Sequence, residues 1–218
     1  GELGNAATNV AFPLTTSCVA IALLFGIGGA SSFNLALGRK QKEDAVYYMG
    51  NAAVLLFSLG AVLCLVTQLF LTPMLRFFGA PDSVLPYAVT YTRITSLGFP
   101  FLIYSSGGAH LVRADGTPRY SMVCNLTGAL INTVLDPLLI FGFQMGMAGA
   151  ALATIIGQIV AAGMIFRYML HCRTVRLERR HLMIRMKHTI HIMSLGMSSF
   201  FNQIAMMIVQ IVLNNSLT

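Results

Sequence analysis

The sequence predicts an all-α integral membrane protein, a polytopic bundle of helices, and three observations support this prediction. Of its 218 residues, 56% are hydrophobic and only 10% are charged, whereas water-soluble domains carry about 25% charged residues. Apolar runs of roughly 17–25 residues, the length that crosses ~30 Å of hydrocarbon, recur along the chain. Basic residues gather in every second gap between these runs, as cytoplasmic loops require.

Six hydrophobic segments follow one another, with ends defined to within a few residues. They cover about 11–37, 45–70, 84–112, 120–143, 148–170 and the chain from about 190 onward. The third segment is interrupted by Gly98-Phe99-Pro100. Small residues are dense within the segments, as in GIGGASS (26–32), and small side chains let membrane helices approach closely. GIGGASS lacks the GK[ST] ending of a phosphate-binding loop, so close helix packing is the better interpretation.

The net charge of +7 arises from basic clusters between the segments, and their grouping favours a bilayer over nucleic acid. Twelve of the 14 Lys and Arg residues fall into three clusters: Arg39, Lys40 and Lys42; Arg113 and Arg119; and seven residues between Arg167 and Lys187. The positive-inside rule assigns these clusters to the cytoplasm, which puts the N-terminus of this chain outside. The longest basic stretch is predicted to link two lobes.

The sequence contains no recognisable catalytic constellation, so we expect that the protein is not an enzyme. It has no HExxH, no GxSxG and no Cys–His arrangement. His188 and His191 stand three residues apart without further ligands, which argues against a metal site. The four cysteines are scattered and form no CxxC, so they are interpreted as packing residues.

One carboxylate, Asp136, lies inside the apolar stretch NTVLDPLLIFGF. A charge in hydrocarbon costs several kcal/mol unless it is paired, hydrated or protonated. Asn132 precedes it by one helical turn and Asn125 by three, so the three side chains share one helix face. Pro137 has no N–H to donate to the carbonyl of Thr133, and a freed carbonyl beside a carboxylate is a typical cation ligand.

The next segment returns across the membrane after a tight turn and brings Thr154 to about the depth of Asp136. Gln158 lies one turn deeper on the same face. These oxygen ligands suit Na⁺, while a desolvated carboxylate can instead carry H⁺, and both chemistries stay open. The competing interpretation is that Asp136 is structural and is hydrogen-bonded to Asn132. Asn202 and Gln203, in the sixth segment, are further candidates for lining a cavity, or for bonds between helices.

Three stretches resemble the multidrug and toxic compound extrusion (MATE) family of efflux transporters: NLTGALINTVLDPLLIFGFQMGMAGAALATIIGQ, VRADGTPRYSM and NLALGRKQKEDA. The resemblance covers essentially the whole chain. It implies a twelve-helix transporter of two six-helix lobes that exchanges Na⁺ or H⁺ for cationic or amphipathic drugs by alternating access. On this pattern the chain is part of a longer protein and corresponds to helices two to seven: an N-terminal lobe in 1–170, a cytoplasmic linker in 171–189 and the start of the C-terminal lobe in 190–218.

The resemblance also implies a site. The family's cation ligands correspond to Asn132 and Asp136 on helix five and Thr154 on helix six. A further Asp on helix one lies outside this chain, and Asn202 and Gln203 stand where some members carry a Glu. The implied protein is a multi-pass cell-membrane monomer when full length. It binds drugs and the lipid bilayer but no nucleic acid, and it needs no cofactor other than the coupling ion.

Two alternatives remain. A lipid-linked oligosaccharide flippase or polysaccharide exporter shares a related fold but should carry several Arg or Lys residues in the membrane, where only Arg93 is a candidate. A membrane scaffold without transport activity would have no reason to align Asn132, Asp136 and Thr154 at one depth.

Overall fold

The computed structural model describes residues 2–217, and all regular structure in that range is helical. Five of its helices are long and apolar enough to span a membrane: Gly4–Gly38, Lys42–Leu69, Pro118–Gly142, Gly146–Met169 and Met186–Leu213. Many large apolar side chains point away from the bundle, among them Leu65 at 64% exposure and Phe141 at 77%. Such a surface suits a hydrocarbon solvent, and the prediction of a helical membrane bundle is confirmed.

The helices follow the order predicted for the six segments. They are α1 (Glu2–Gly38), α2 (Lys42–Leu69), α3 (Leu71–Phe77), α4 (Leu85–Thr95), α5 (Phe99–Ala114), α6 (Pro118–Pro137), α7 (Gly146–Met169) and α8 (Met186–Leu217). Shorter turns join them: the 3₁₀ helices η1 (Ser96–Gly98) and η3 (Arg179–Leu182), and a single π turn, η2 (Leu138–Gly142). Two ends differ from the prediction. α1 begins about nine residues earlier, and α8 begins inside the stretch that was predicted as a linker.

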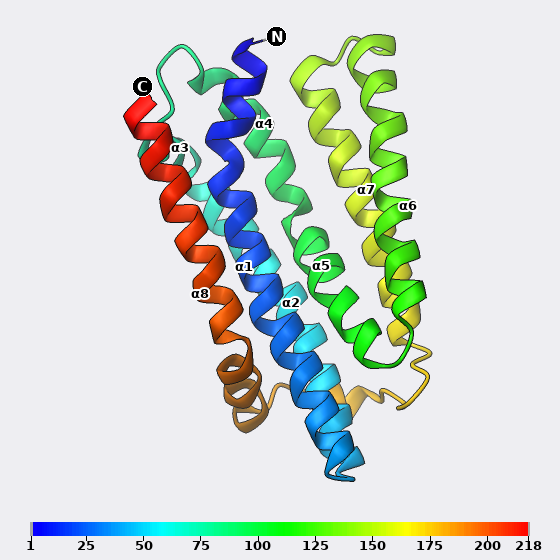
Figure 1. Ribbon diagram of the computed structural model, residues 1–218. Coiled ribbons are helices and arrows are strands. Elements are labelled where there is room, and N and C mark those ends of the chain that lie inside the picture. Colours follow the sequence, from blue (N-terminus) through cyan, green and yellow to red (C-terminus); the bar gives the residue numbers. More distant parts are fainter. Residues whose placement is uncertain (1, 218) are drawn as a thin grey trace.

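The bundle has α1 and α8 side by side at one edge and the pair α6 and α7 at the other (Figure 1). α5 packs between them and contacts α1, α2, α6 and α7, while α4 packs against α1 and α7. The loop between α1 and α2, the loop between α5 and α6, and the segment between α7 and α8 all lie at one end of the bundle (Figure 1). The three basic clusters lie in these connections and in the helix ends beside them, so they share one side of the bundle. The assignment of that side to the cytoplasm stays a prediction.

The predicted interruption of the third segment is confirmed. α4 ends at Thr95, one 3₁₀ turn follows, and α5 begins at Phe99 with Pro100 in its first turn. Proline is tolerated there because the first N–H groups of a helix have no intrahelical partner. Gly60 of α2 lies against this break, since a Cβ built on it would lie 2.5 Å from the Pro100 Cα.

Close packing by the small residues of GIGGASS is also confirmed. A Cβ built on Gly28 of α1 would lie 2.0 Å from the Ile192 carbonyl oxygen of α8, and one built on Gly196 of α8 would lie 1.9 Å from the Leu24 carbonyl oxygen. The two backbones therefore cross in direct contact, which only glycine permits.

The segment between α7 and α8 is tied to the bundle at two places. The buried Asn51 side chain of α2 donates to the Tyr47 and Met183 carbonyls, and its Oδ1 accepts the Arg185 N–H at 2.7 Å. Asp115, after α5, accepts the main-chain N–H of Arg173 at 2.6 Å. The basic segment 170–185, called the strap below, is therefore held against the bundle by these hydrogen bonds.

Candidate functional site

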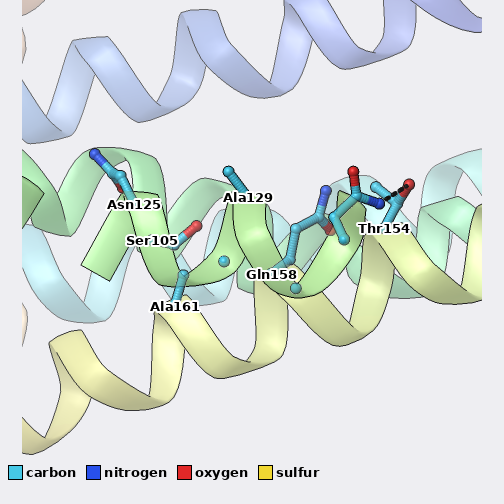
Figure 2. A pocket seen from close by; sticks show the side chains of 9 residues that line it. Ser105, Asn125, Ala129, Thr154, Gln158 and Ala161 are labelled. Atoms are coloured by element: carbon cyan, nitrogen blue, oxygen red, sulfur yellow. Dashed lines mark hydrogen bonds between the residues drawn. The ribbon is translucent and has the colours of Figure 1, made fainter. Parts of the chain in front are cut away.

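The predicted cation ligands meet where α6 and α7 lie side by side. The Asn132 Nδ2 of α6 is 3.4 Å from the Thr154 Oγ1 of α7, the bond drawn as a dashed line in Figure 2, and 3.5 Å from the Asp136 Oδ1 one turn on. Thr154 in turn donates to the Ala150 carbonyl at 3.0 Å. Both contacts of Asn132 are long for hydrogen bonds, so its amide bridges the two oxygens without being tightly held.

Two glycines set the distance between α6 and α7. A Cβ built on Gly128 would lie 2.9 Å from the Gly157 carbonyl oxygen, and one built on Gly157 would lie 2.6 Å from the Gly128 carbonyl oxygen. Asn132 lies one turn after Gly128, and Thr154 lies one turn before Gly157. Because the helices run antiparallel from this close crossing, the two polar side chains come opposite each other.

A cavity of about 210 Å³ opens beside these residues. It is lined by Ser105, Asn125, Gly128, Ala129, Asn132, Thr154, Gly157, Gln158 and Ala161. In Figure 2, Asn125 stands at one end of the cavity and Thr154 at the other, with Gln158 between them. The lining includes no basic residue, so the wall offers oxygen and amide groups without positive charge.

Gln158 contributes a buried acceptor that has no partner in the described part of the chain, its Oε1. This oxygen reaches the backbone of the break between α4 and α5, since a Cβ built on Gly98 would lie 2.6 Å from it. Absence of a side chain at position 98 therefore leaves room for the Gln158 amide at the cavity wall.

Asp136 lies beside this cavity and is half-buried. Its only described hydrogen bond is the long one from Asn132, and no Lys, Arg or His in residues 2–217 forms an ion pair with it. α6 ends directly after it at Pro137 and opens into the π turn, where the Phe143 N–H reaches back to the Leu138 carbonyl at 3.1 Å. Single π turns often mark functional positions, because they reorient the backbone beside a site.

Two contributors to the site were not predicted from the sequence. Ser105 of α5 lines the cavity, and Tyr91 of α4 lies within electrostatic range of Asp136. Both come from the interrupted third segment, whose two halves cannot be placed on a common helical face by counting residues. The run SSGG (105–108) is typical of close helix packing and does not by itself indicate a cavity wall.

Asn202 and Gln203 lie on α8, which packs mainly against α1 at the opposite edge of the bundle. Asn202 is exposed, and neither side chain lines the cavity beside Asp136. A role for them in a larger cavity stays a prediction.

Comparison with known proteins gives a consistent result. The MatE family model matches residues 1–138. The chain is 31% identical over 160 residues to the multidrug export protein MepA of Staphylococcus haemolyticus, which is 73% of this chain and 35% of that protein. It is 26% identical over 219 residues to MepA of Staphylococcus saprophyticus, covering 98% and 49%. It is 30% identical over 183 residues to an FAD transporter of Shewanella oneidensis, covering 82% and 40%. The chain thus spans about a third to a half of these relatives.

Solved structures agree with this result. An inward-facing multidrug resistance MATE family transporter superimposes with a TM-score of 0.90 at 25% identity, over 99% of this chain and 49% of that one. An outward-facing structure of a multidrug resistance MATE family transporter gives a TM-score of 0.85 at 25% identity, covering 93% and 46%.

Proposed function

This chain belongs to the MatE family, and on that premise we propose that it forms part of a secondary active efflux transporter in which Asp136 binds the coupling cation. Asn132 and Thr154 complete the ligand set on this side of the site. The transporter exchanges Na⁺ or H⁺ for cationic or amphipathic compounds by alternating access. Cation binding at Asp136 biases the protein between its two states through its different affinity for each.

The observation that carries the proposal is a membrane carboxylate without a countercharge. Asp136 has no ion-pair partner in the described chain, and its one hydrogen bond is 3.5 Å long. A structural aspartate at this depth would be held by short bonds from several donors, because an unpaired charge is costly there. The open coordination of Asp136, with the Asn132 amide beside it and the Thr154 hydroxyl on the other side of that amide, supports a role in binding a cation that enters and leaves.

The absence of basic residues from the lining of the cavity also supports a preference for cations. Its nine lining residues carry no formal charge, so Asp136 at its edge supplies the dominant local field. A negative field in a low-dielectric cavity favours cations.

The test is the substitution Asp136→Asn in the full-length protein, reconstituted into vesicles with an imposed Na⁺ or pH gradient. Uptake of a cationic dye should fall at least about tenfold, since ligands to a charged group contribute about 1.5–3 kcal/mol each. Asp82→Asn is the matched control, because Asp82 is exposed and meets only the exposed Arg76 at 3.6 Å. Undiminished gradient-driven transport by Asp136→Asn would refute the cation role.

Substitution Thr154→Val then separates the two coupling ions. Na⁺ requires several oxygen ligands, so loss of the Thr154 hydroxyl should weaken Na⁺-driven transport about tenfold or more. A proton needs only the carboxylate, so H⁺-driven transport should change little.

Because one relative is a multidrug exporter and another an FAD transporter, the same vesicles should also be offered FAD as an anionic substrate.

A further inference from the structure

A second and larger cavity lies on another face of the bundle, as an apolar groove between α2, α5, α7 and the segment that follows α7. Its volume is about 590 Å³, within the roughly 300–1,000 Å³ of pockets that hold small-molecule ligands. The residues that line the groove include Phe57, Tyr104, Gly163, Phe166, Glu178 and Arg179. None of these residues belongs to the cavity beside Asp136.

The charged end of the groove carries one unpaired cation. Glu178 is neutralised, because its carboxylate binds the Arg180 Nε at 2.9 Å and caps the short helix η3. Arg179, by contrast, makes no side-chain hydrogen bond and no ion pair with any residue in the described range 2–217. An anion at this end of the groove would therefore meet a free guanidinium.

The wall of the groove also presents a tyrosine hydroxyl. Tyr104 is only 7% exposed, and its side chain lines the groove, yet its hydroxyl makes no hydrogen bond within the described chain. A polar atom of a bound molecule would supply a hydrogen-bond partner.

The position of the groove along the membrane-span helices indicates which solvent surrounds each end of it. η3 lies beyond the end of the membrane-span candidate Gly146–Met169, so we place Arg179 near the membrane surface. Along the groove, Phe57 and Phe166 are 46% and 56% exposed, and both lie within membrane-span candidates. A molecule that fits both ends has an apolar chain and an anionic head.

We propose that this groove binds an anionic glycerophospholipid from the leaflet on the side of the basic segment. The phosphate pairs with Arg179, a polar atom of the glycerol-ester region bonds to Tyr104, and an acyl chain lies along Phe57 and Phe166. Basic pockets between membrane helices on the cytoplasmic side are suited to such headgroups, and the positive-inside rule puts this segment there. The site is independent of cation binding at Asp136.

The first test measures lipid retention by native mass spectrometry of the full-length protein titrated with phosphatidylglycerol or phosphatidylcholine. Phosphatidylglycerol should be retained preferentially, and Arg179→Gln should weaken its binding about fivefold, the contribution of one basic residue near a membrane surface. Arg176→Gln is the matched control, since Arg176 is exposed, unpaired in the described chain and absent from the groove lining. Equal losses in the two variants would reduce the effect to general surface charge and overturn the proposal.

The second test fills the groove. Gly163 lines it, and a Cβ built there meets nothing within 4 Å, so Gly163→Phe should occupy the acyl-chain volume without disturbing the backbone. Phosphatidylglycerol retention should fall at least about fivefold in Gly163→Phe and stay unchanged in Gly163→Ala. If Gly163→Phe retains lipid normally, or if it unfolds the protein because another protein segment fills the groove, the proposal is wrong.

Discussion

The crossing of α1 and α8 makes Gly196→Ala a direct test of how the preceding helices hold the helix that follows the basic segment. The Cβ added at Gly196 would lie 1.9 Å from the Leu24 carbonyl oxygen. That is roughly 1.5 Å shorter than the ~3.5 Å at which nonbonded heavy atoms make their best contact. The obstacle is the backbone of α1 rather than a flexible side chain, so the two helices must move apart.

Moving α1 and α8 apart lowers the free energy of unfolding. Overpacking a close contact costs about 1–3 kcal/mol, and α1 and α8 share an extended interface, so we expect about 2 kcal/mol for Gly196→Ala. For a domain of this size that corresponds to a drop of ~4–8 °C in unfolding temperature. Gly28→Ala should behave alike, since its Cβ would lie 2.0 Å from the Ile192 carbonyl oxygen.

The assay is thermal unfolding of the full-length protein in detergent, with Gly163→Ala as the control. Gly163 is also a helix-interior glycine, but its added Cβ meets open space, so alanine there should stabilise the protein by about 0.5–1 kcal/mol. The unfolding temperature is therefore expected to fall in Gly196→Ala and to rise in Gly163→Ala. If Gly196→Ala leaves the unfolding temperature unchanged or raises it, the backbone contact between α1 and α8 is refuted.

Two further predictions concern the strap between α7 and α8. Asn51→Ala removes the acceptor of the Arg185 N–H, held at 2.7 Å, so the strap should loosen and trypsin should cut the purified protein at Arg179 or Arg180 at least about fivefold faster; an unchanged rate contradicts this docking. Burial, and then the Asp115 carboxylate, raise the pKa of Cys172 to about 12, so it remains a thiol at neutral pH. As the single cysteine of a variant, it should react with maleimide at least about tenfold more slowly than an unperturbed thiol, and Asp115→Asn should accelerate the reaction.

The part of the site on α6 and α7 could be predicted because its geometry is local. Asn132 and Asp136 are one turn apart on a single helix, and only a tight turn separates that helix from the one carrying Thr154. Rise per residue and chain direction then give the depth of each side chain. The structure brings the Asn132 amide to within 3.5 Å of both partners, in agreement with this counting.

Longer-range relations could not be predicted in the same way. GIGGASS indicated a close helix contact, but nothing in it identifies Gly196, far along the chain, as the partner. Tyr91 and Ser105 were missed because a 3₁₀ turn separates α4 from α5, and its three residues per turn change the helical phase between them. Periodicity describes one helix face at a time, whereas pairing of distant faces depends on shape complementarity across the bundle.

The contacts at the end of the bundle near the strap bear on how a cation at Asp136 affects the rest of the protein. α7 carries Thr154 beside Asp136 and, near its other end, Tyr168, whose hydroxyl donates to Asp115 at 2.7 Å. Asp115 also accepts the Arg173 N–H of the strap, and the strap continues through Asn51 to α8. A shift of α7 on cation binding therefore has a path to α8 that runs through these hydrogen bonds and the backbone of the strap between Arg173 and Arg185. Such a path transmits coupling only if the strap has two arrangements, so a cation-dependent cleavage rate of the strap, lost in Asp136→Asn, would be the direct sign of it.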